Sequence, residues 1–222
     1  MIERERFNRI RQDHGCHGSW AVWALSSGRP KSEVGNLEVL DERLNPTLLE
    51  TLNPGVVMVG LNLGHGSADK PDKPFRNFHS LNPSAHDFKI RHAFSGTDFW
   101  GAYMTDVIKD VVEPVSGKLI AWLRHNPQVI ADNIKTFRTE LSDLGHHRPV
   151  ILAFGGAVYD LLGANLGTDD YSRLVRLTHY SYRIRKEKYR DEVHLQLLSS
   201  KELPNQRLHP TAASSTASGG RG

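Results

Sequence analysis

The sequence predicts an α/β protein, a single three-layer α/β/α domain around a central four-stranded parallel sheet. Between residues 56 and 198, short apolar segments with strand character alternate with segments of helical periodicity. Such alternation is typical of parallel strands joined by crossover helices. The clearest strand, at residues 56–61, is a continuous apolar run with three valines, as expected of a strand buried on both faces. A chain of 222 residues can bury the core that one such domain needs.

The N-terminal region predicts a helix over residues 3–27 with a break at residues 14–18. Beyond the break, Trp20 and Trp23 are three positions apart, a spacing that places them on one helical face for core packing. Residues 28–46 contain Gly, Pro and Asn and predict a connection without regular structure. The first strand of the sheet follows this connection.

A polar loop follows the strand at residues 56–61 and extends to about residue 84. Most connections are about 4–6 residues long, so a loop of this length at the end of a buried strand indicates a functional segment. A short helix is expected at residues 85–94 and a second strand at residues 99–109.

The clearest helix covers residues 127–144, because Pro127 opens it, apolar residues recur at helical spacing and Gly145 follows its end. A third strand is expected at residues 149–154, and the Gly155-Gly156 turn leads from it into a helix that runs to residue 162. A fourth strand is expected at residues 174–178 and a last helix at residues 185–198.

Residues 1–203 make up the predicted domain. Residues 204–222 predict a disordered tail, because they are rich in Ser, Ala and Gly and almost free of large apolar side chains. No apolar run approaches the length of a membrane span, so we expect no membrane association. The charged N-terminus lacks the apolar core of a signal peptide, and we therefore expect a cytoplasmic protein.

The single cysteine, Cys16, excludes an internal disulfide and a cysteine-rich metal site built by one chain. His14 and His17 flank it and superficially suggest a metal site. A zinc site usually needs four ligands, and no fourth is in sight.

Basic residues gather at positions 183–190, where RIRKEKYR contains five basic side chains and one acidic side chain. The net charge of the chain is +3. One interpretation is a solvated helix face, and the other is an edge that contacts phosphates.

Polar residues lie at the ends of three of the four predicted strands, namely Asn62, Asp106 and His179. Because the carboxyl ends of parallel strands line a common crevice, we expect these side chains to converge there. Each residue alone is a weak signal, and their convergence is the main argument for a site.

These residues lie in motifs that resemble those of the uracil-DNA glycosylase superfamily, over roughly residues 55–190. The segment Gly60-Leu61-Asn62-Leu63-Gly64 is similar to the first motif, Gly-(Leu/Ile/Met)-Asn-Pro-Gly, of the mismatch-specific and single-strand-selective branches. Pro74-Phe75 has the spacing of the aromatic residue that stacks on an extruded base. Tyr103-Met104-Thr105-Asp106 resembles the motif of the second strand. Ala153-Phe154-Gly155-Gly156 resembles the turn after the third strand, and His179-Tyr180-Ser181 resembles the His-Pro-Ser motif.

The chain departs from the family pattern at three positions. Leu63 and Tyr180 replace the usual prolines, and Asp106 replaces a familiar Asn. The resemblance implies hydrolysis of the N-glycosidic bond of a flipped uracil or deaminated base in DNA, as in base excision repair, by a monomer without a metal or other cofactor. The base must leave its stack first, because the bond is unreachable inside a duplex.

In this resemblance, Asn62 and His179 are the catalytic residues. Asn62 holds a water near the sugar carbon, and His179 donates a hydrogen bond to the departing base. Asn62 could instead cap the turn after the strand. The base contacts implied are Gly60, Leu61, Leu63, Gly64, Phe75 and Asp106.

Phe75 and Asp106 each leave alternatives open. Phe75 either stacks on the base or plugs the core and folds the loop back. An ionised Asp106 accepts a hydrogen bond from the N–H of uracil but repels its carbonyl oxygen, whereas a protonated Asp106 satisfies both groups. In a third alternative, Asp106 bonds to backbone groups and does not touch the base. A preferred base with an exocyclic amine would also suit the ionised form.

The segment after His179 predicts contacts with the DNA backbone. Ser181 could contact a phosphate, and Tyr182 or Ile184 could wedge into the vacated stack. Arg183, Arg185 and Lys186 would hold phosphates.

Three other functions fit the same fold. A catalytically inactive nucleic-acid-binding module would explain Leu63, Tyr180 and Asp106, and a small nucleoside or nucleotide hydrolase would need no DNA contact. Gly155-Gly156 alone is weak evidence for a generic nucleotide-binding domain. The tail around LHPT resembles the ends of proteins encoded in integron gene cassettes, which bears on genomic origin and not on mechanism.

Overall fold

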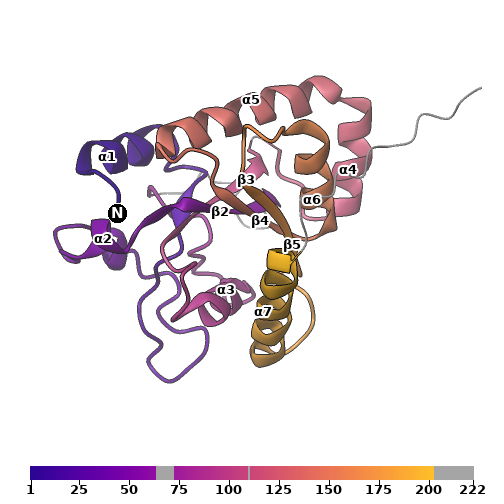
Figure 1. Cartoon of the computed structure of the whole chain (residues 1–222). Coiled ribbons are helices and arrows are strands. Elements are labelled where there is room, and N and C mark those ends of the chain that lie inside the picture. Colours follow the sequence, from indigo (N-terminus) through magenta and orange to yellow (C-terminus); the bar gives the residue numbers. More distant parts are fainter. Residues whose placement is uncertain (64–72, 110, 203–222) are drawn as a thin grey trace, which may run out of the picture.

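The chain folds around one five-stranded sheet, shown in the computed structural model of Figure 1. The structure describes residues 1–63, 73–109 and 111–202, with side chains as far as residue 200. Gly64 and the predicted tail at 204–222 lie outside the described residues. The strand order is β1-β3-β2-β4-β5. The strands are β1 (Ser19–Trp20), β2 (Asn53–Asn62), β3 (Ala102–Ile108), β4 (Val150–Phe154) and β5 (Arg173–Leu177).

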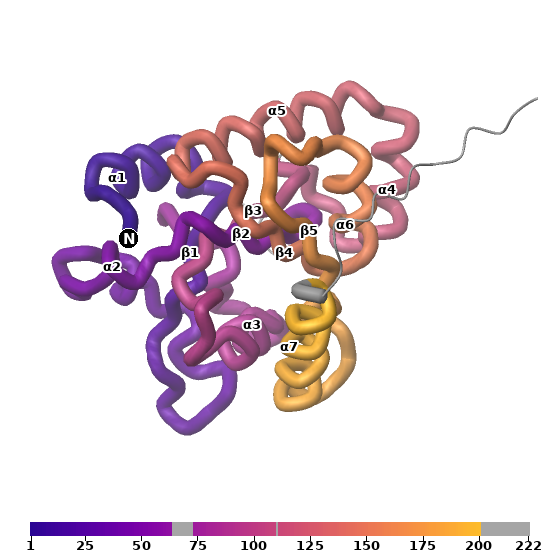
Figure 2. Tube along the Cα trace, in the orientation of Figure 1, coloured from indigo at the N-terminus to yellow at the C-terminus, as the bar shows by residue number. Residues whose placement is uncertain are grey.

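Helices cover both faces of the sheet and make a three-layer α/β/α arrangement (Figures 1 and 2). On one face lie α1 (Arg4–Asp13), α4 (Ser116–His125), α5 (Pro127–Leu144) and α6 (Gly156–Asn165). On the other face, α3 (Asp87–Phe94) and α7 (Lys186–Glu202) pack side by side. Two single turns, η1 (Glu38–Leu40) and α2 (Leu48–Thr51), precede β2.

Strands β2, β3, β4 and β5 pair in parallel, which confirms the prediction drawn from the alternation of strands and helices. The prediction of four strands is wrong, because β1 adds a fifth, antiparallel strand at the edge of β3. Residues 19–27 therefore do not continue a helix. The backbone N–H of Ala21 donates to the carbonyl of Ala102 at 2.8 Å, so this segment satisfies the edge of β3 instead.

Alternation along β2 decides which residues face which layer. Val57 and Val59 pack on the side of α1 and α5, whereas Val56 and Met58 pack on the side of α3 and α7. Because side chains alternate along a strand, Gly60 and Asn62 also face the α3 and α7 side. Position 106 of β3 shares that side, since β2 and β3 pair Gly60 with Asp106. No helix among the described residues is long and apolar enough to cross a membrane.

Candidate functional site

The candidate site lies at the carboxyl ends of the parallel strands, on the face covered by α3 and α7. Gly60 and Asn62 come from the end of β2, Asp106 comes from β3, and His179 follows β5. The rings of Phe78 and Tyr180 link them, because Phe78 lies beside Gly60 and Asp106 and its centroid is 6.3 Å from that of Tyr180. The three strand-end residues predicted to converge are thus on one face and one edge of the sheet.

Asn62 ties the end of β2 to the loop that follows β3. Its Nδ2 donates to the carbonyl oxygens of Val111 and Glu113, both at 3.0 Å, and of Leu63 at 3.2 Å. These three acceptors fix the orientation of the amide, because a flipped amide would bring oxygen against oxygen. Among the described residues, none donates a hydrogen bond to Oδ1 of Asn62. The side chain therefore anchors a loop and still offers one acceptor.

Asp106 is a buried carboxyl held by a neighbouring amide. Its Oδ2 accepts a hydrogen bond of 2.9 Å from Nδ2 of Asn77, which also donates to the carbonyl of His17 at 2.7 Å. Its Oδ1 lies over Gly60, where an added Cβ would be only 2.2 Å away. Residue 60 has room for this carboxyl because it is glycine. No described residue donates a hydrogen bond to Oδ1.

The charge of Asp106 is set by burial. With 3 % of the residue exposed, loss of solvation raises the pKa of Asp106 to about 6. The Asn77 hydrogen bond and the positive charge of Lys109 act in the opposite direction, and the negative charges of Glu140 and Asp87 act with burial. This carboxyl therefore titrates close to neutral pH.

A buried ion pair lies behind Asp106, on the side of α5. Nζ of Lys109 is 3.0 Å from Oε2 of Glu140 and donates to the backbone carbonyl of Asp106 at 2.6 Å. Thr105 and Tyr103 donate from their hydroxyls to Glu140 at 3.2 and 3.4 Å. A buried pair needs such extra hydrogen bonds to offset desolvation. The pair fixes the backbone from which the Asp106 side chain extends.

His179 presents a defined tautomer. Its Nδ1 accepts from the backbone N–H of Ser181 at 3.1 Å and lies 2.8 Å from the Ser181 hydroxyl. An Nδ1 that accepts is unprotonated, so the neutral ring carries its proton on Nε2. Burial, followed by the charge of His86, lowers the pKa of His179 to about 4. At neutral pH this side chain is an uncharged N–H donor, and its ring stacks on Tyr180 with centroids 4.4 Å apart.

A cleft of about 510 Å³ opens beside His179. The Gly155-Gly156 turn after β4 forms one wall, and Glu192 and Gln196 of α7 line it with Arg176. Gly155 adopts φ +95°, a conformation that L side chains rarely adopt, and it turns the chain from β4 directly into α6. His179 therefore borders a cleft large enough for a ligand of nucleoside size, although Asn62 and Asp106 do not line this cleft.

Phe75 lies on the other side of the sheet from Asp106. Its ring is 5.5 Å from that of Phe7 of α1, in the core beneath α1 and α5, and 2 % of the residue is exposed. Its backbone N–H donates to Gly15 at 2.7 Å, and its carbonyl accepts from Ser19. Of the two roles expected of Phe75, the ring has the packing of the core plug that folds the loop back, and it does not lie on the face of the sheet that carries Asp106. Phe78, three residues later, is the aromatic residue beside Asp106.

Two further base contacts predicted from the first motif are core residues. Leu61 packs on the α1 and α5 side of the sheet, away from Asp106. Leu63 is buried.

The segment predicted to contact DNA divides into buried and exposed side chains. Tyr182 is 61 % exposed and lines the cleft, whereas Ile184 packs against the core beneath α7. Of the two predicted wedges, Tyr182 is therefore the accessible one. Nζ of Lys89 on α3 donates to the Tyr182 carbonyl at 2.6 Å and holds this segment in place. The neighbouring residues Ser181, Arg183 and Arg185 are exposed, and Lys186 pairs with Glu187 at 2.7 Å.

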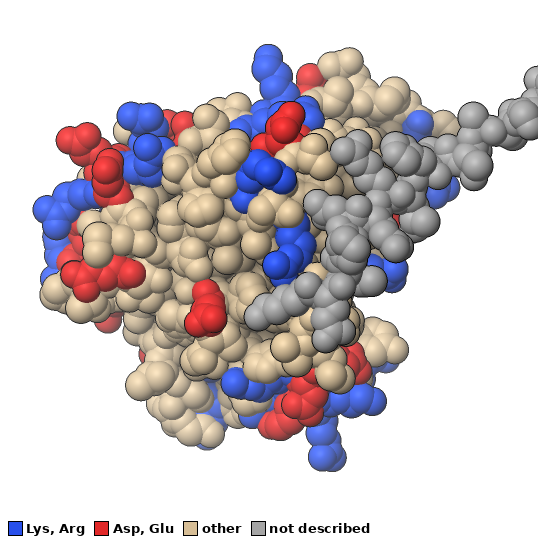
Figure 3. Space-filling model, in the orientation of Figure 1, with Lys and Arg blue, Asp and Glu red and all other residues tan. Residues whose placement is uncertain are grey.

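Basic side chains are dispersed over the face shown in Figure 3. Lys and Arg alternate with Asp and Glu around α1 and around α7. Such mixing agrees with a solvated surface for much of the basic segment. Among the described residues, no group of three or more His, Cys, Asp or Glu could hold a metal ion. His14 instead contacts Asp143, at 2.7 Å between Nε2 and Oδ2.

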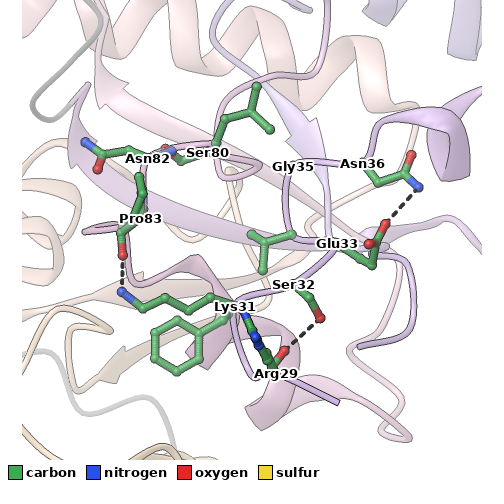
Figure 4. Close-up of a pocket in the computed structure, with 13 residues that line it drawn as sticks. Arg29, Lys31, Ser32, Glu33, Gly35, Asn36, Ser80, Asn82 and Pro83 are labelled. Carbon is green, nitrogen blue, oxygen red and sulfur yellow. Dashed lines mark hydrogen bonds between the residues drawn. The ribbon is translucent and has the colours of Figure 1, made fainter. Parts of the chain in front are cut away.

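A second cavity of about 550 Å³ lies between the loop at residues 29–36 and the segment at residues 80–88, which ends in the first turn of α3 (Figure 4). Lys31 crosses it to the carbonyl of Pro83 and lies over the Phe88 ring at 5.4 Å. Ser32 donates to the carbonyl of Arg29 at 2.8 Å, and Asn36 donates to Glu33 at 3.4 Å. These polar side chains are engaged with the two loops themselves. This cavity contains none of the predicted site residues.

Sequence reasoning missed Asn77 and Phe78, which lie in the long loop and reach Asp106 only through the fold. The segment Pro74-Phe75-Arg76-Asn77-Phe78 contained the signal, since it has two aromatic residues and an amide in five positions. No protein-family model, no curated protein and no solved structure matches this chain.

Proposed function

We propose that this protein hydrolyses the N-glycosidic bond of a base that has left its stack in DNA. The observation that carries the proposal is His179, an uncharged ring whose Nδ1 is occupied by Ser181 and whose Nε2–H is left to donate beside a cleft. A neutral donor suits a leaving base, because negative charge develops on the base as the bond breaks.

The other residues fit the remaining parts of such a reaction. Asn62 offers Oδ1 as an acceptor that orients a water, while its Nδ2 is fixed on the loop after β3. Asp106, held by Asn77, faces the pairing edge of the base. The rings of Phe78 and Tyr180 supply the apolar wall that excludes water from the leaving group.

The reaction proceeds by departure of the base with the bonding electron pair. The bond between C1′ and the base nitrogen breaks, and the Nε2–H of His179 stabilises the charge on the base oxygen. The water oriented by Asn62 then forms the new bond to C1′ and loses one proton to solvent, while the base takes up a proton. Asn62 acts by position rather than as a base, since an amide is not basic.

The test is base release from oligonucleotides that carry uracil, hypoxanthine or xanthine, single-stranded and double-stranded, followed by alkaline cleavage of abasic sites. We expect strand scission with the unaltered protein and none with His179→Ala or Asn62→Ala. His147→Ala is the matched control, because His147 is exposed at the opposite end of the sheet.

Two negative results separate the rival functions. Binding without scission on every substrate would favour an inactive nucleic-acid-binding module. Absence of binding as well would favour a small nucleoside or nucleotide as substrate, for which the dispersed surface charge of Figure 3 is adequate.

A further inference from the structure

We infer that a third cavity, between the segment at residues 23–30 and α3, binds a small aromatic carboxylate, a ligand with one ring and one negative charge. This cavity has a volume of about 270 Å³. It shares no lining residue with the cleft beside His179. The inference therefore goes beyond the proposed function and does not depend on it.

Aromatic side chains form the apolar walls of this cavity. Trp23, Phe88 and Trp100 line it. The ring centroids of Trp23 and Trp100 are 5.7 Å apart and their planes are inclined by 59°, so the two indoles present surfaces of different orientation. The indole N–H of Trp23 donates to the carbonyl of Phe78 at 3.2 Å, which fixes this ring. Rings held in this way pack well against a flat apolar ligand.

A buried guanidinium lines the same cavity. Arg91 of α3 is only 7 % exposed, and none of the ion pairs among the described residues includes it. Its Nη1 donates to the carbonyls of Ala24 and Ser32, both at 2.9 Å, and its Nη2 donates to the carbonyl of Pro30 at 2.6 Å. A guanidinium has five N–H donors, and no described residue accepts from Nε or from the second hydrogen of Nη2. Arg91 thus holds the segment beside α3 and retains two donors, for which a carboxylate is a strong acceptor.

Positive charge gathers around this cavity. Its charged and titratable lining residues are Arg91, His92 and Lys186, and none of the described residues that line it is Asp or Glu. The pKa of His92 is lowered by burial and then by the positive charges of Lys186, Arg190 and Arg91, whereas Glu187 acts in the opposite direction. Glu187 is an exposed partner of Lys186, at 2.7 Å. A buried cation without an anionic partner is costly, so an anion beside Arg91 would offset part of that cost.

Ring and charge together define the ligand. The aromatic walls favour a ring, the guanidinium favours a carboxylate, and ligand sites in proteins begin at about 300 Å³, close to the volume of this cavity. The cavity is therefore suited to one ring with a short acidic substituent.

The first test is a titration of the ¹⁵N-labelled protein with benzoate, followed through the indole N–H signals of its four tryptophans. We expect the signals of Trp23 and Trp100 to shift, and the signal of Trp122 on α4 to stay unchanged as the control. Benzyl alcohol has the ring without the charge, and acetate has the charge without the ring. Benzoate should bind at least about tenfold more tightly than either, a factor of about 1.4 kcal/mol.

The second test places a negative charge at the rim of the cavity. Leu25 lines the cavity and is 90 % exposed, so its substitution does not disturb the core. Leu25→Asp should weaken benzoate binding about three- to fivefold, the effect of one exposed charge, and leave benzyl alcohol unaffected. Leu25→Asn is the matched control, because it has the size of Asp without the charge, and it should bind benzoate as the unaltered protein does.

Three results would each overturn the inference. One is equal affinity for benzoate and benzyl alcohol, which would reduce the cavity to an apolar surface. Another is the same effect of Leu25→Asp and Leu25→Asn on benzoate binding. The third is the absence of any shift of the Trp23 and Trp100 signals at about 20 mM benzoate, a concentration at which even a ligand of this size should bind.

Discussion

The Nδ2 atom of Asn77 donates a 2.9 Å hydrogen bond to Oδ2 of the buried carboxyl of Asp106. Asn77 comes from the loop between β2 and α3, and Asp106 comes from the carboxyl-terminal part of strand β3. The bond therefore joins the most conspicuous loop of the sequence to the strand end that carries its least expected residue.

Asp106→Asn should change stability in a pH-dependent way. The pKa of Asp106 is raised from 3.8 to about 6, so between these pH values the unfolded chain has lost its proton while the folded chain still holds it. Stability thus falls as pH rises through this window and levels off above about pH 6. The amide variant has no such loss, and we expect it to be more stable by about 3 kcal/mol at pH 8 and nearly unchanged at pH 4. Urea titrations at the two pH values measure this difference, and an equal effect at both would contradict it.

Gly60→Ala should displace the Asp106 carboxyl. The added Cβ would lie 2.2 Å from Oδ1, closer than any real contact, so the side chain must move and its bond with Asn77 is lost. We expect a loss of about 1–3 kcal/mol in the free energy of unfolding, together with loss of base release. Gly117→Ala in α4 is the control, because nothing lies within 4 Å of its added Cβ. Thermal melts and the scission assay on both variants measure these two losses. A Gly60→Ala protein with the stability and base release of the Gly117→Ala control would contradict the prediction.

The tautomer of His179 can be observed directly. Long-range ¹⁵N correlation spectra should show the proton on Nε2 at neutral pH, because Nδ1 accepts from Ser181. The pKa of His179 is lowered to about 4, so its signals should stay unchanged from pH 8 to about 5 and shift only below that. His147, exposed at the far end of the sheet, provides the comparison within the same spectrum. A midpoint near the usual value of histidine would show that the ring is solvated.

Phe75→Leu and Phe78→Leu should separate folding from activity. Phe75 packs on Phe7 beneath α1, so its truncation should destabilise the protein by about 1–3 kcal/mol and spare base release per folded molecule. Phe78 lies against Gly60 and Tyr180, and its truncation should reduce release because the wall of the site is lost. Release rates at a temperature well below both melting points test the pair. Equal loss of activity in the two variants would argue against a local role for Phe78.

The parallel part of the sheet was predictable because its signals are local. Strands β2 and β4 contain short apolar runs, β3 and β5 have apolar residues at most of their positions, and Pro127 and Gly145 mark the ends of α5. The antiparallel strand β1 was not predictable in this way. Trp20 and Trp23 have helical spacing, yet they lie in the two different cores on opposite faces of the sheet. Pairing with β3 overrides the local pattern there, as tertiary contacts often do for short segments. Helix α4 was missed because it buries only Leu119 and Leu123.

The site was predictable where it lies on strand ends and not where it lies on a loop. Register places Asp106 opposite Gly60, so the strand pattern was enough to bring these positions together. The loop that supplies Asn77 and Phe78 has no hydrophobic periodicity, and its path depends on where its aromatic side chains pack in the fold. The spacing from Asn62 favoured Phe75 over Phe78 as the aromatic residue of the site. In the fold, Phe75 packs beneath α1, and Phe78 lies on the face of the sheet that is covered by α3 and α7.

The short strand β1 also affects whether the sheet can pair edge to edge with the sheet of another molecule. Without it, β3 would present the unpaired N–H and C=O groups of a seven-residue strand to other chains. The two residues of β1 and the bond from Ala21 to Ala102 occupy that edge at residues 102–104. At the opposite edge, β5 carries Arg173 and Arg176, whose charges disfavour strand addition. Both edges of the sheet thus carry a feature that disfavours pairing with another chain.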